Sequence, residues 1–377
     1  MRPEPPSPPS PEAGQTAVEA ERHAFRCDNC GAELRWDPDA DALRCDFCQT
    51  ARPVPRDEGT VLERPLTAAA AAAAAGLGLN LRLARCEECG ARVSFADAAT
   101  AATCVYCGAA VVLDQEANRQ AIRPESLVPL DLGRAAVEEA FRRWVRRLWL
   151  RPRALRRARV AEAAGVYVPF WTFDCAVHSD WTADAGYSYW VTERYTVLVN
   201  GRPEQRSRRV RRVRWVPVRG KRDDAYDDLL VCASAGLSGD LLERLGPFDT
   251  TALVPYRPEY LAGWRAEEYT IDLEAGWQEA QARVEAEQRR RCEGDVPGDT
   301  HRDLRVRNRI HEVSWKHVLL PVWSLSYRFR GCTWTVLVNG QTGRVAGEAP
   351  YSRWKVFGLL LAVAAASFLF RLVLNQR

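Results

Sequence analysis

The sequence predicts an α+β protein with two small four-cysteine zinc ribbons, a β-rich body of internally repeated antiparallel hairpin units plus helices, and one C-terminal transmembrane helix. Three observations support this fold class. Eight of the twelve cysteines fall into four C-x-x-C pairs, the string TVLVNG occurs twice among stretches of alternating hydrophobicity, and the chain ends in an uncharged apolar run. With 377 residues, 47% of them hydrophobic, the chain is long enough for two or three domains.

Composition divides the chain into segments. Residues 1–15 hold six prolines and no large apolar side chain, so they cannot offset their ordering entropy by burial. No basic stretch followed by an apolar one begins the chain, so we expect no secretory signal. The predicted order is a disordered tail (1–22), the first ribbon (23–55), an alanine-rich linker or helix (56–82), the second ribbon (83–115), an arginine-rich helix region (116–160), the β-rich body (161–352) and an anchor (353–377).

Each ribbon follows the pattern C-x2-C-x14-C-x2-C, and eight of its 22 positions are identical in the other ribbon. Gly31 and Gly90 follow the first pairs, where a Cβ would crowd the turn that directs backbone N–H groups at the thiolates. Four thiolates favour zinc in a closed tetrahedral site. The sequence therefore predicts two zinc ions, one held by Cys27, Cys30, Cys45 and Cys48 and one by Cys86, Cys89, Cys104 and Cys107.

Two other arrangements use the same cysteines. The pairs could be crossed, so that one ion takes a pair from each ribbon, or iron could replace zinc as in other thiolate tetrads. The matching spacing within each ribbon favours independent closure. Aromatic residues at matching positions, Trp36 with Phe95 and Phe47 with Tyr106, are expected to shield the two metal sites.

The C-terminal run 356–370 contains fifteen uncharged residues and is followed by Arg371 and three more apolar residues. Nineteen helical residues rise about 28 Å, which is just enough for the hydrocarbon core of a bilayer. A buried core helix is the competing interpretation, but only three residues follow the run and could pack behind it. We therefore expect a tail anchor, in a single-pass membrane protein whose main body stays in the cytoplasm.

Basic residues concentrate in 131–222, which carries 21 Arg or Lys against 9 Asp or Glu. Within it, apolar residues at helical spacing predict an amphipathic helix from Asp131 as N-cap to a break at or before Pro152. Its arginines could solvate one face, lie on anionic lipid headgroups or bind nucleic acid. The chain has 50 Arg and 3 Lys, so arginine richness alone indicates little. The predicted lipid contacts are Arg142, Arg143, Arg146, Arg147, Arg353, Trp354, Lys355 and Arg371.

The predicted body contains repeated sequence strings. The strings VYVPFWTF (166–173) and LLPVWSLSY (319–327) share a P-x-W core, and TVLVNG follows each of them, at 196–201 and 335–340. We expect two related units, each a strand through P-x-W, a return, and a strand that runs into an Asn-Gly turn. Alternation in 207–220 predicts a half-exposed strand, and 274–292 predicts a helix packed on the sheet.

Catalytic motifs are missing from the sequence. It has no G-x-x-x-x-G-K-[ST] phosphate loop and no H-E-x-x-H pair, and its five histidines show no ligand spacing. The acidic cluster Asp223, Asp224, Asp227 and Asp228 could hold a divalent cation, but it follows an arginine-rich strand, so pairing with arginine is the favoured interpretation. We expect no enzymatic activity, no catalytic residue and no small-molecule substrate.

Several of these strings together resemble a known family. They are the paired CxxCGA ribbons, GVYVPFWTF, FDTTALVPYRPEYLAGWRAEEYTIDL and LVNGQTGRVAGEAPYSRWK before an apolar tail. They resemble bacterial tandem zinc-ribbon membrane proteins often named primosomal protein N′-like, replication factor Y-like or TFIIB-type zinc-ribbon proteins. The resemblance covers nearly the whole chain after about residue 24 and is most specific in 247–267. Without a phosphate loop the ATPase of a primosomal helicase is not expected. The long alanine linker and proline tail depart from the family pattern.

Two hypotheses for function follow. Relatives in that family are often encoded beside phage-shock-type and SPFH-type proteins, so the resemblance implies a non-enzymatic adaptor at the inner membrane that recruits protein partners, in contact with membrane lipid, in a membrane-stress response. The alternative is a membrane-tethered nucleic-acid-binding protein that uses ribbon 2 and the basic 131–222 surface. The acidic residues between the knuckles of ribbon 1 fit a phosphate backbone poorly, which favours the adaptor.

Overall fold

The computed structural model contains three very long strands, and the pairing of two of them at the centre of a sheet organises the rest of the chain. The predicted proline-rich tail and most of the alanine-rich linker lie outside the residues that the structure describes. Those residues are 25–56, 61, 63–66, 82–86, 88–89, 91–95, 102–104, 106, 110–111, 114–116, 122–199, 202–236, 241 and 244–375.

At the centre, strands β11 (Val160–Val199) and β15 (Thr300–Phe329) pair in antiparallel fashion. The two P-x-W segments lie opposite each other, with Tyr167 paired to Pro321 and Pro169 paired to Leu319. Side chains here are buried on both faces of the sheet, for example Trp323 on one face and Phe170 on the other. The continuous apolar strings around each proline are therefore core strands of a sheet that is covered on both sides.

The neighbours of these two strands are arranged with local pseudo-twofold symmetry. Strand β12 (Arg202–Cys232) ends beside Phe170, and strand β16 (Cys332–Asn339) ends beside Val322. Just past these ends, β14 (Arg265–Glu268) lies parallel to β11, and β10 (Ser126–Leu127) lies parallel to β15. The carbonyls of the two P-x-W prolines accept hydrogen bonds from Ala233 and Gly340. The repeated P-x-W strings therefore correspond to two similar strand arrangements at the centre of the sheet.

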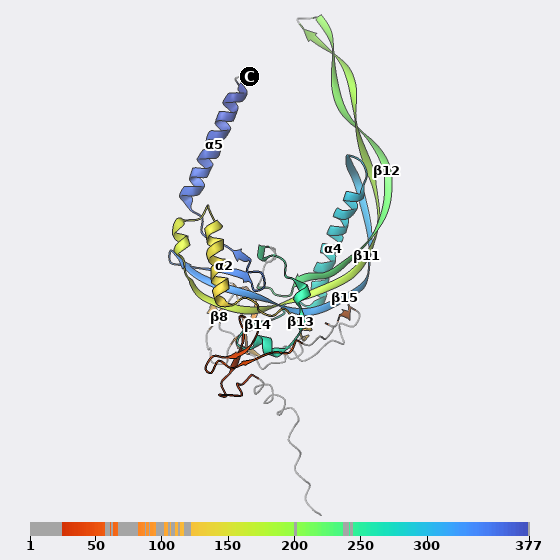
Figure 1. The fold of residues 1–377 in the computed structure, drawn as a ribbon. Helices are drawn as coiled ribbons and strands as arrows, with labels where there is room; N and C mark the ends of the chain where they lie inside the picture. Colours follow the sequence, from red (N-terminus) through yellow and green to blue (C-terminus); the bar gives the residue numbers. More distant parts are fainter. Residues whose placement is uncertain are drawn as a thin grey trace, which may run out of the picture.

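Two helices pack against this sheet (Figure 1). Helix α2 (Arg134–Arg147) places the Phe141 ring 5.2 Å from that of Tyr327. Helix α4 (Leu273–Asp295) begins at Asp272, whose carboxylate accepts a hydrogen bond from the Ala275 N–H at 2.8 Å. Both helices agree with the sequence prediction, although α2 has Gly133 rather than Asp131 as its N-cap.

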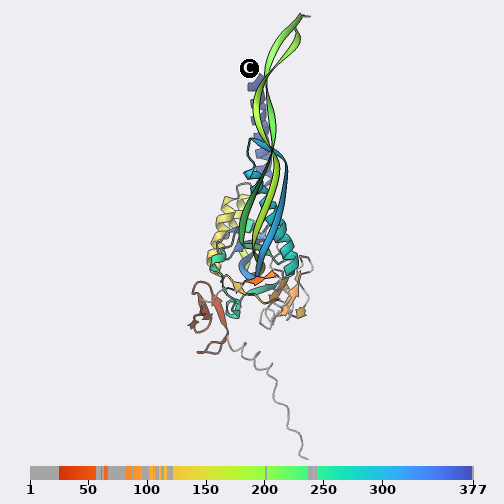
Figure 2. The ribbon, with the colours of Figure 1, turned by 90° about the vertical axis from the view of Figure 1, so that its right-hand side faces the viewer.

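Short elements complete the described chain. The first ribbon contains β1, β2 and β3, and the second contributes β5, β6 and β9 to the large sheet, so that both ribbons lie at one end of the body (Figure 2). These and the remaining elements are β1 (Leu34–Asp37), β2 (Ala42–Cys45), β3 (Ala51–Arg52), β4 (Arg64–Pro65), β5 (Arg82–Arg85), β6 (Arg92–Phe95), β7 (Ala102–Thr103), β8 (Ala110–Val111), β9 (Asp114–Glu116), β13 (Val254–Pro255), β17 (Val345–Gly347), α5 (Arg353–Asn375) and the 3-10 helices Arg153–Arg157, Thr250–Ala252 and Pro258–Leu261.

The prediction of two equivalent hairpin units is wrong. The first P-x-W segment and the first TVLV string lie on the single 40-residue strand β11, whereas the second pair is divided between β15 and β16. The structural counterpart of TVLVN in β16 is the end of β12, because Cys232 faces Phe170 as Asn339 faces Val322. The first Asn-Gly pair lies outside the described residues.

The prediction of a C-terminal transmembrane helix is also wrong. Residues 353–375 form the expected helix α5, but across the described ranges no helix reaches the combination of length and hydrophobicity that a bilayer span requires. The uncharged run of fifteen residues rises only about 22 Å and includes Gly358, four alanines and Ser367. The assignment to the inner membrane as a single-pass protein falls with this prediction.

The contact between α4 and the sheet gives a test of the fold. Trp171 lies under Gly276, where an added Cβ would be 2.6 Å from Cδ1 of the indole. Trp171 cannot move away easily, because its Nε1 donates a hydrogen bond to the Ile271 carbonyl at 2.9 Å. Overpacking at such a position costs about 1–3 kcal/mol. We therefore predict that Gly276→Ala lowers the midpoint of urea unfolding.

Gly294 in the same helix provides the matched control. A Cβ built there has no atom within 4 Å, so Gly294→Ala should gain helix propensity and stabilise by up to about 1 kcal/mol. Unfolding followed by tryptophan fluorescence compares the two variants. Equal effects of both substitutions would contradict the close packing of α4 on Trp171.

Candidate metal centres and the docking of the two ribbons

The first four-cysteine cluster is assembled by two similar turns. The N–H of Gly31 donates to the Cys27 carbonyl at 2.8 Å, and the N–H of Gln49 donates to the Cys45 carbonyl at 3.0 Å. Gly31 and Gln49 both have a positive φ, of 73° and 61°, which closes each turn tightly. Each turn thus brings its own two cysteines to one point.

The sulfur positions in this cluster suit a tetrahedral metal. The Sγ atoms of Cys27 and Cys48 are 3.4 Å apart, as are those of Cys30 and Cys45, and all four lie within 4.8 Å of one another. Metal–sulfur bonds of about 2.3 Å in a tetrahedron place sulfurs about 3.8 Å apart. A hydrogen bond with the Thr50 hydroxyl lowers the pKa of Cys48, whereas hydrogen bonds with neighbouring thiols raise the pKa of Cys30. The four residues could therefore hold one metal ion.

The second cluster follows the same plan. Cys86, Cys89 and Cys104 have sulfurs within 4.8 Å of one another, and Cys107 lies outside the described residues. The N–H of Cys86 donates to the Ala91 carbonyl at 2.9 Å, as the N–H of Cys27 does to the Ala32 carbonyl at 2.7 Å. In the described part of the chain, each cluster draws its cysteines from one ribbon, which agrees with independent closure.

The first ribbon is docked on the body through Trp36. Its indole is 3% exposed, lies 4.7 Å from the Tyr260 ring, and donates from Nε1 to the Leu130 carbonyl at 3.3 Å. The backbone N–H of Trp36 donates to the Ala262 carbonyl at 3.0 Å. Trp36 therefore packs in the core of the body.

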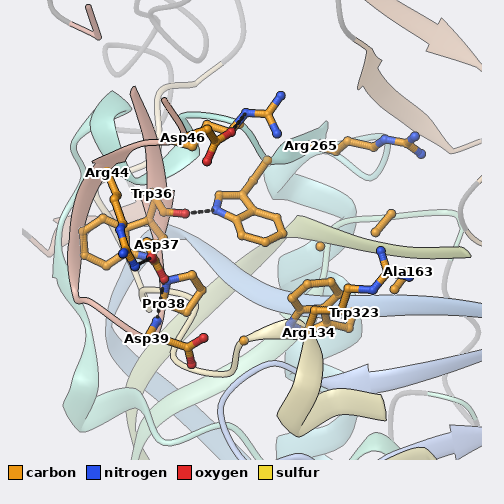
Figure 3. Close-up of a pocket in the computed structure, with 16 residues that line it drawn as sticks. Trp36, Asp37, Pro38, Asp39, Arg44, Asp46, Arg134, Ala163, Arg265 and Trp323 are labelled. Atoms are coloured by element: carbon orange, nitrogen blue, oxygen red, sulfur yellow. Dashed lines mark hydrogen bonds and ion pairs between the residues drawn. The ribbon is translucent and has the colours of Figure 1, made fainter. Parts of the chain in front are cut away.

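A cleft of about 470 Å³ runs along the seam between the first ribbon and the body (Figure 3). Several of its charged lining side chains already face opposite charges, with Arg44 at 3.1 Å from Asp37 and Arg134 at 3.0 Å from Glu138. The Asp39 carboxylate lies against Gly133 at the N-terminus of α2, where a negative charge is favourable. The cleft is best explained as a docking seam.

The second ribbon is docked differently, as an extension of the large sheet. Strand β6 pairs with β14, which places Val93 opposite Glu267. The fully buried Glu267 carboxylate accepts hydrogen bonds from the Tyr106 hydroxyl at 2.6 Å and the Ser234 hydroxyl at 2.5 Å. The next residue, Glu268, pairs with Arg92 at 3.2 Å. Tyr106, which lies between the last two cysteines of the second ribbon, thus fixes this ribbon to the body.

The corresponding residue of the first ribbon has no such role. Phe47 occupies the position of Tyr106, between the last two cysteines, and its side chain is 83% exposed. The expectation that Phe47 shields the metal site is therefore wrong. Tyr106 is involved in docking, and the side chain of Phe95 lies outside the described set.

The predicted lipid contacts lie at two neighbouring places. Arg142, Arg143, Arg146 and Arg147 are exposed on α2, and Arg353 and Trp354 are exposed at the start of α5. Lys355 instead donates from Nζ to the carbonyls of Trp149 and Arg151, both at 2.7 Å, which ties α5 to the segment after α2. The side chain of Arg371 is outside the described set. Contact of these residues with lipid stays a prediction.

The expected pairing with arginine is found for one member of the acidic cluster. Asp224 contacts Arg222 and Arg291, whereas Asp228 forms an ion pair with Lys316 at 2.8 Å and Asp223 contacts His178. The carboxylates of Asp174, Asp227 and Asp228 lie within 4.8 Å of one another, so the Lys316 ammonium balances charge where a cation could otherwise bind. Sequence analysis did not find Asp174 or Lys316, because neither is near the cluster in the sequence.

Comparison with known proteins shows a similarity to a bacterial protein. The uncharacterized protein YdjG of Bacillus subtilis (strain 168) is 28% identical over 265 residues, which cover 70% of this chain and 73% of YdjG. No family model matches the chain. No solved structure matches it either.

Burial of Glu267 gives a pH-dependent prediction. Desolvation raises the pKa of this carboxyl from 4.5 to about 7, so the charged form is disfavoured in the folded state. The protonated Glu267 carboxyl therefore contributes fully to the stability of the folded state below pH 4.5, and this contribution is lost as the pH rises through 7. Glu267→Gln removes this loss, which amounts to at most about 3 kcal/mol.

The measurement is the free energy of unfolding of both proteins at pH 5 and pH 8. The variant should gain stability relative to the natural chain at the higher pH. Both proteins contain the same cysteines, so the pH dependence of the cysteines cancels when the two free energies of unfolding are subtracted. A difference that is constant between pH 5 and pH 8 would contradict the buried position of Glu267.

Proposed function

We propose that the protein is a non-enzymatic adaptor whose two ribbons are closed by zinc and whose first ribbon binds a partner protein at Phe47. The exposure of Phe47 carries the proposal. The same position in the second ribbon is occupied by Tyr106, whose hydroxyl binds the buried Glu267. The position between the last two cysteines is therefore used for internal docking in the second ribbon, whereas in the first ribbon it is exposed.

Zinc is the metal that the donor set favours. Thiolates are soft ligands, and four of them in a tetrahedron leave no position for water or substrate. The residues that would hold the ions are the eight cysteines of the four C-x-x-C pairs. Such closed sites stabilise a small module that lacks a core of its own. The zinc ions would therefore shape the binding surface and take no part in a reaction.

The surroundings of Phe47 indicate the chemistry of the partner. Asp28 and Asp46 are exposed on the two knuckles, and Asp46 is 3.7 Å from Arg35. An exposed phenylalanine with acidic neighbours fits an apolar pocket that has basic side chains at its rim. The family resemblance supports phage-shock-type and SPFH-type proteins as the class in which to look for this partner.

Metal content gives the first test. Purified protein should contain two zinc ions per chain, and Cys27→Ser should contain about one and lose stability in the body as well, since Trp36 packs in the body core. Cys332→Ser is the matched control, because Cys332 is exposed and lies in neither cluster. Zinc content near zero, or a Cys27→Ser variant that keeps two ions, would contradict the two-site proposal.

Site-specific crosslinking gives the second test. Phe47→p-benzoyl-phenylalanine, expressed in the native host, should crosslink on illumination to one prominent protein through residues that line an apolar pocket with a basic rim. The same substitution at Tyr351, which is 63% exposed, is the control for accessibility. The adduct should disappear in a Cys45→Ser background. Equal crosslinking at positions 47 and 351 would overturn the proposed surface.

A further inference from the structure

The basic 131–222 region is not one surface in the structure. Helix α2 packs on the sheet of the body, whereas β11 and β12 continue beyond the body as a two-stranded antiparallel hairpin (Figure 1). Strand β15 stops pairing with β11 at Gly186, opposite Thr300. We call the part beyond this point, Tyr187–Val199 with Arg202–Arg214, the arm.

The length of the arm is not explained by packing within the chain. Its two strands form thirteen residue pairs, which span about 44 Å at about 3.4 Å per residue. An isolated two-stranded ribbon is marginally stable in water. Among the described residues, every pairing of the arm is between its own two strands. Such a projection fits an element that binds something outside the protein.

The charge of the arm exceeds that of the whole protein. Its two strands contain eight arginines against two glutamates, a net charge of +6, whereas the whole chain carries +4. The general preference of this sequence for arginine over lysine does not produce such a concentration. The ligand of the arm is therefore expected to be an anion with many charges.

Aromatic rings are interleaved with these arginines on both faces. Residues opposite each other in an antiparallel pair share a face, so Tyr187 and Tyr189 lie beside Arg214 and Arg212 on one face. Trp190 lies beside Arg211 on the other face. The side chain of Trp190 is 60% exposed and that of Tyr189 is 48% exposed. Flat rings and cations are thus presented together.

Cation–π contacts hold several of these groups in place. The guanidinium of Arg209 lies 5.5 Å from the centre of the Trp190 ring, and that of Arg214 lies 5.9 Å from the Tyr187 ring. Arg208 lies 5.5 Å from the Tyr195 ring. These contacts limit the rotamers of long side chains, which lowers the entropy lost when a ligand binds.

We infer that the arm binds single-stranded nucleic acid. Single strands offer phosphates for the arginines and unpaired base rings that stack on exposed aromatic side chains. A lipid surface would require an apolar face separated from the charges, but both faces of the arm carry arginine. An acidic peptide would satisfy the arginines without using the exposed rings.

Fluorescence anisotropy of the full chain with a labelled 20-nucleotide oligo-dT tests this inference. Binding should weaken steeply as salt rises from 50 to 200 mM. The triple variant Arg209→Gln, Arg211→Gln, Arg214→Gln should lose affinity about tenfold or more and show a log–log salt slope shallower by about 2. The matched control Arg143→Gln, Arg146→Gln, Arg147→Gln removes three exposed charges from α2 and should leave both quantities nearly unchanged.

A second variant separates stacking from charge. Tyr189→Leu with Trp190→Leu should weaken binding about tenfold or more with the salt slope unchanged, because base stacking does not release counterions. Zinc content and unfolding midpoint establish that each variant is folded. The inference is overturned by the absence of binding at 50 mM salt, by equal losses in the arm and α2 triples, or by equally tight binding of poly-glutamate or of anionic lipid vesicles.

Discussion

The antiparallel pairing of β11 with β15 is the interaction on which the rest of the structure depends. Around Tyr167 and Pro321 the two strands are buried on both faces, and their neighbours are repeated with pseudo-twofold symmetry. Helix α4 packs on Trp171 from one strand, and α2 packs on Tyr327 from the other. Both ribbons are also attached here, one through β14 and the other through Leu130, which follows β10.

The two ribbons are similar in sequence but differ in use. In the second, the knuckle aromatic Tyr106 binds a buried carboxylate and joins the ribbon to the sheet. In the first, a residue before the central loop, Trp36, performs the docking, and the knuckle aromatic Phe47 is left exposed. Duplication thus provided one ribbon that completes the body and another that keeps an equivalent surface available. The proposed partner surface rests on this exposed aromatic side chain.

Local patterns in the sequence predicted the parts whose causes are local. The C-x-x-C spacing placed the seven cysteines of the two clusters that the structure describes, and helical periodicity placed α2 and α4. Contacts between distant residues could not be predicted in this way: Tyr106 and Glu267 are 161 positions apart, although Glu267 ends the stretch that carries the family resemblance most specifically. A repeated string was also misleading, because strand periodicity does not show whether a strand turns after P-x-W or continues for 40 residues, as β11 does. Apolar composition alone was likewise insufficient at α5.

The central claim is that the metal-closed ribbons are built into the body, and hydrogen–deuterium exchange of the metal-loaded and chelated protein tests it most directly. If the ribbons support the body, chelation should increase exchange in the ribbons and also at Leu130 and Arg265–Glu268, because these segments contact the ribbons through Trp36 and β6. Faster exchange confined to the ribbons, with these segments unchanged, would contradict the account.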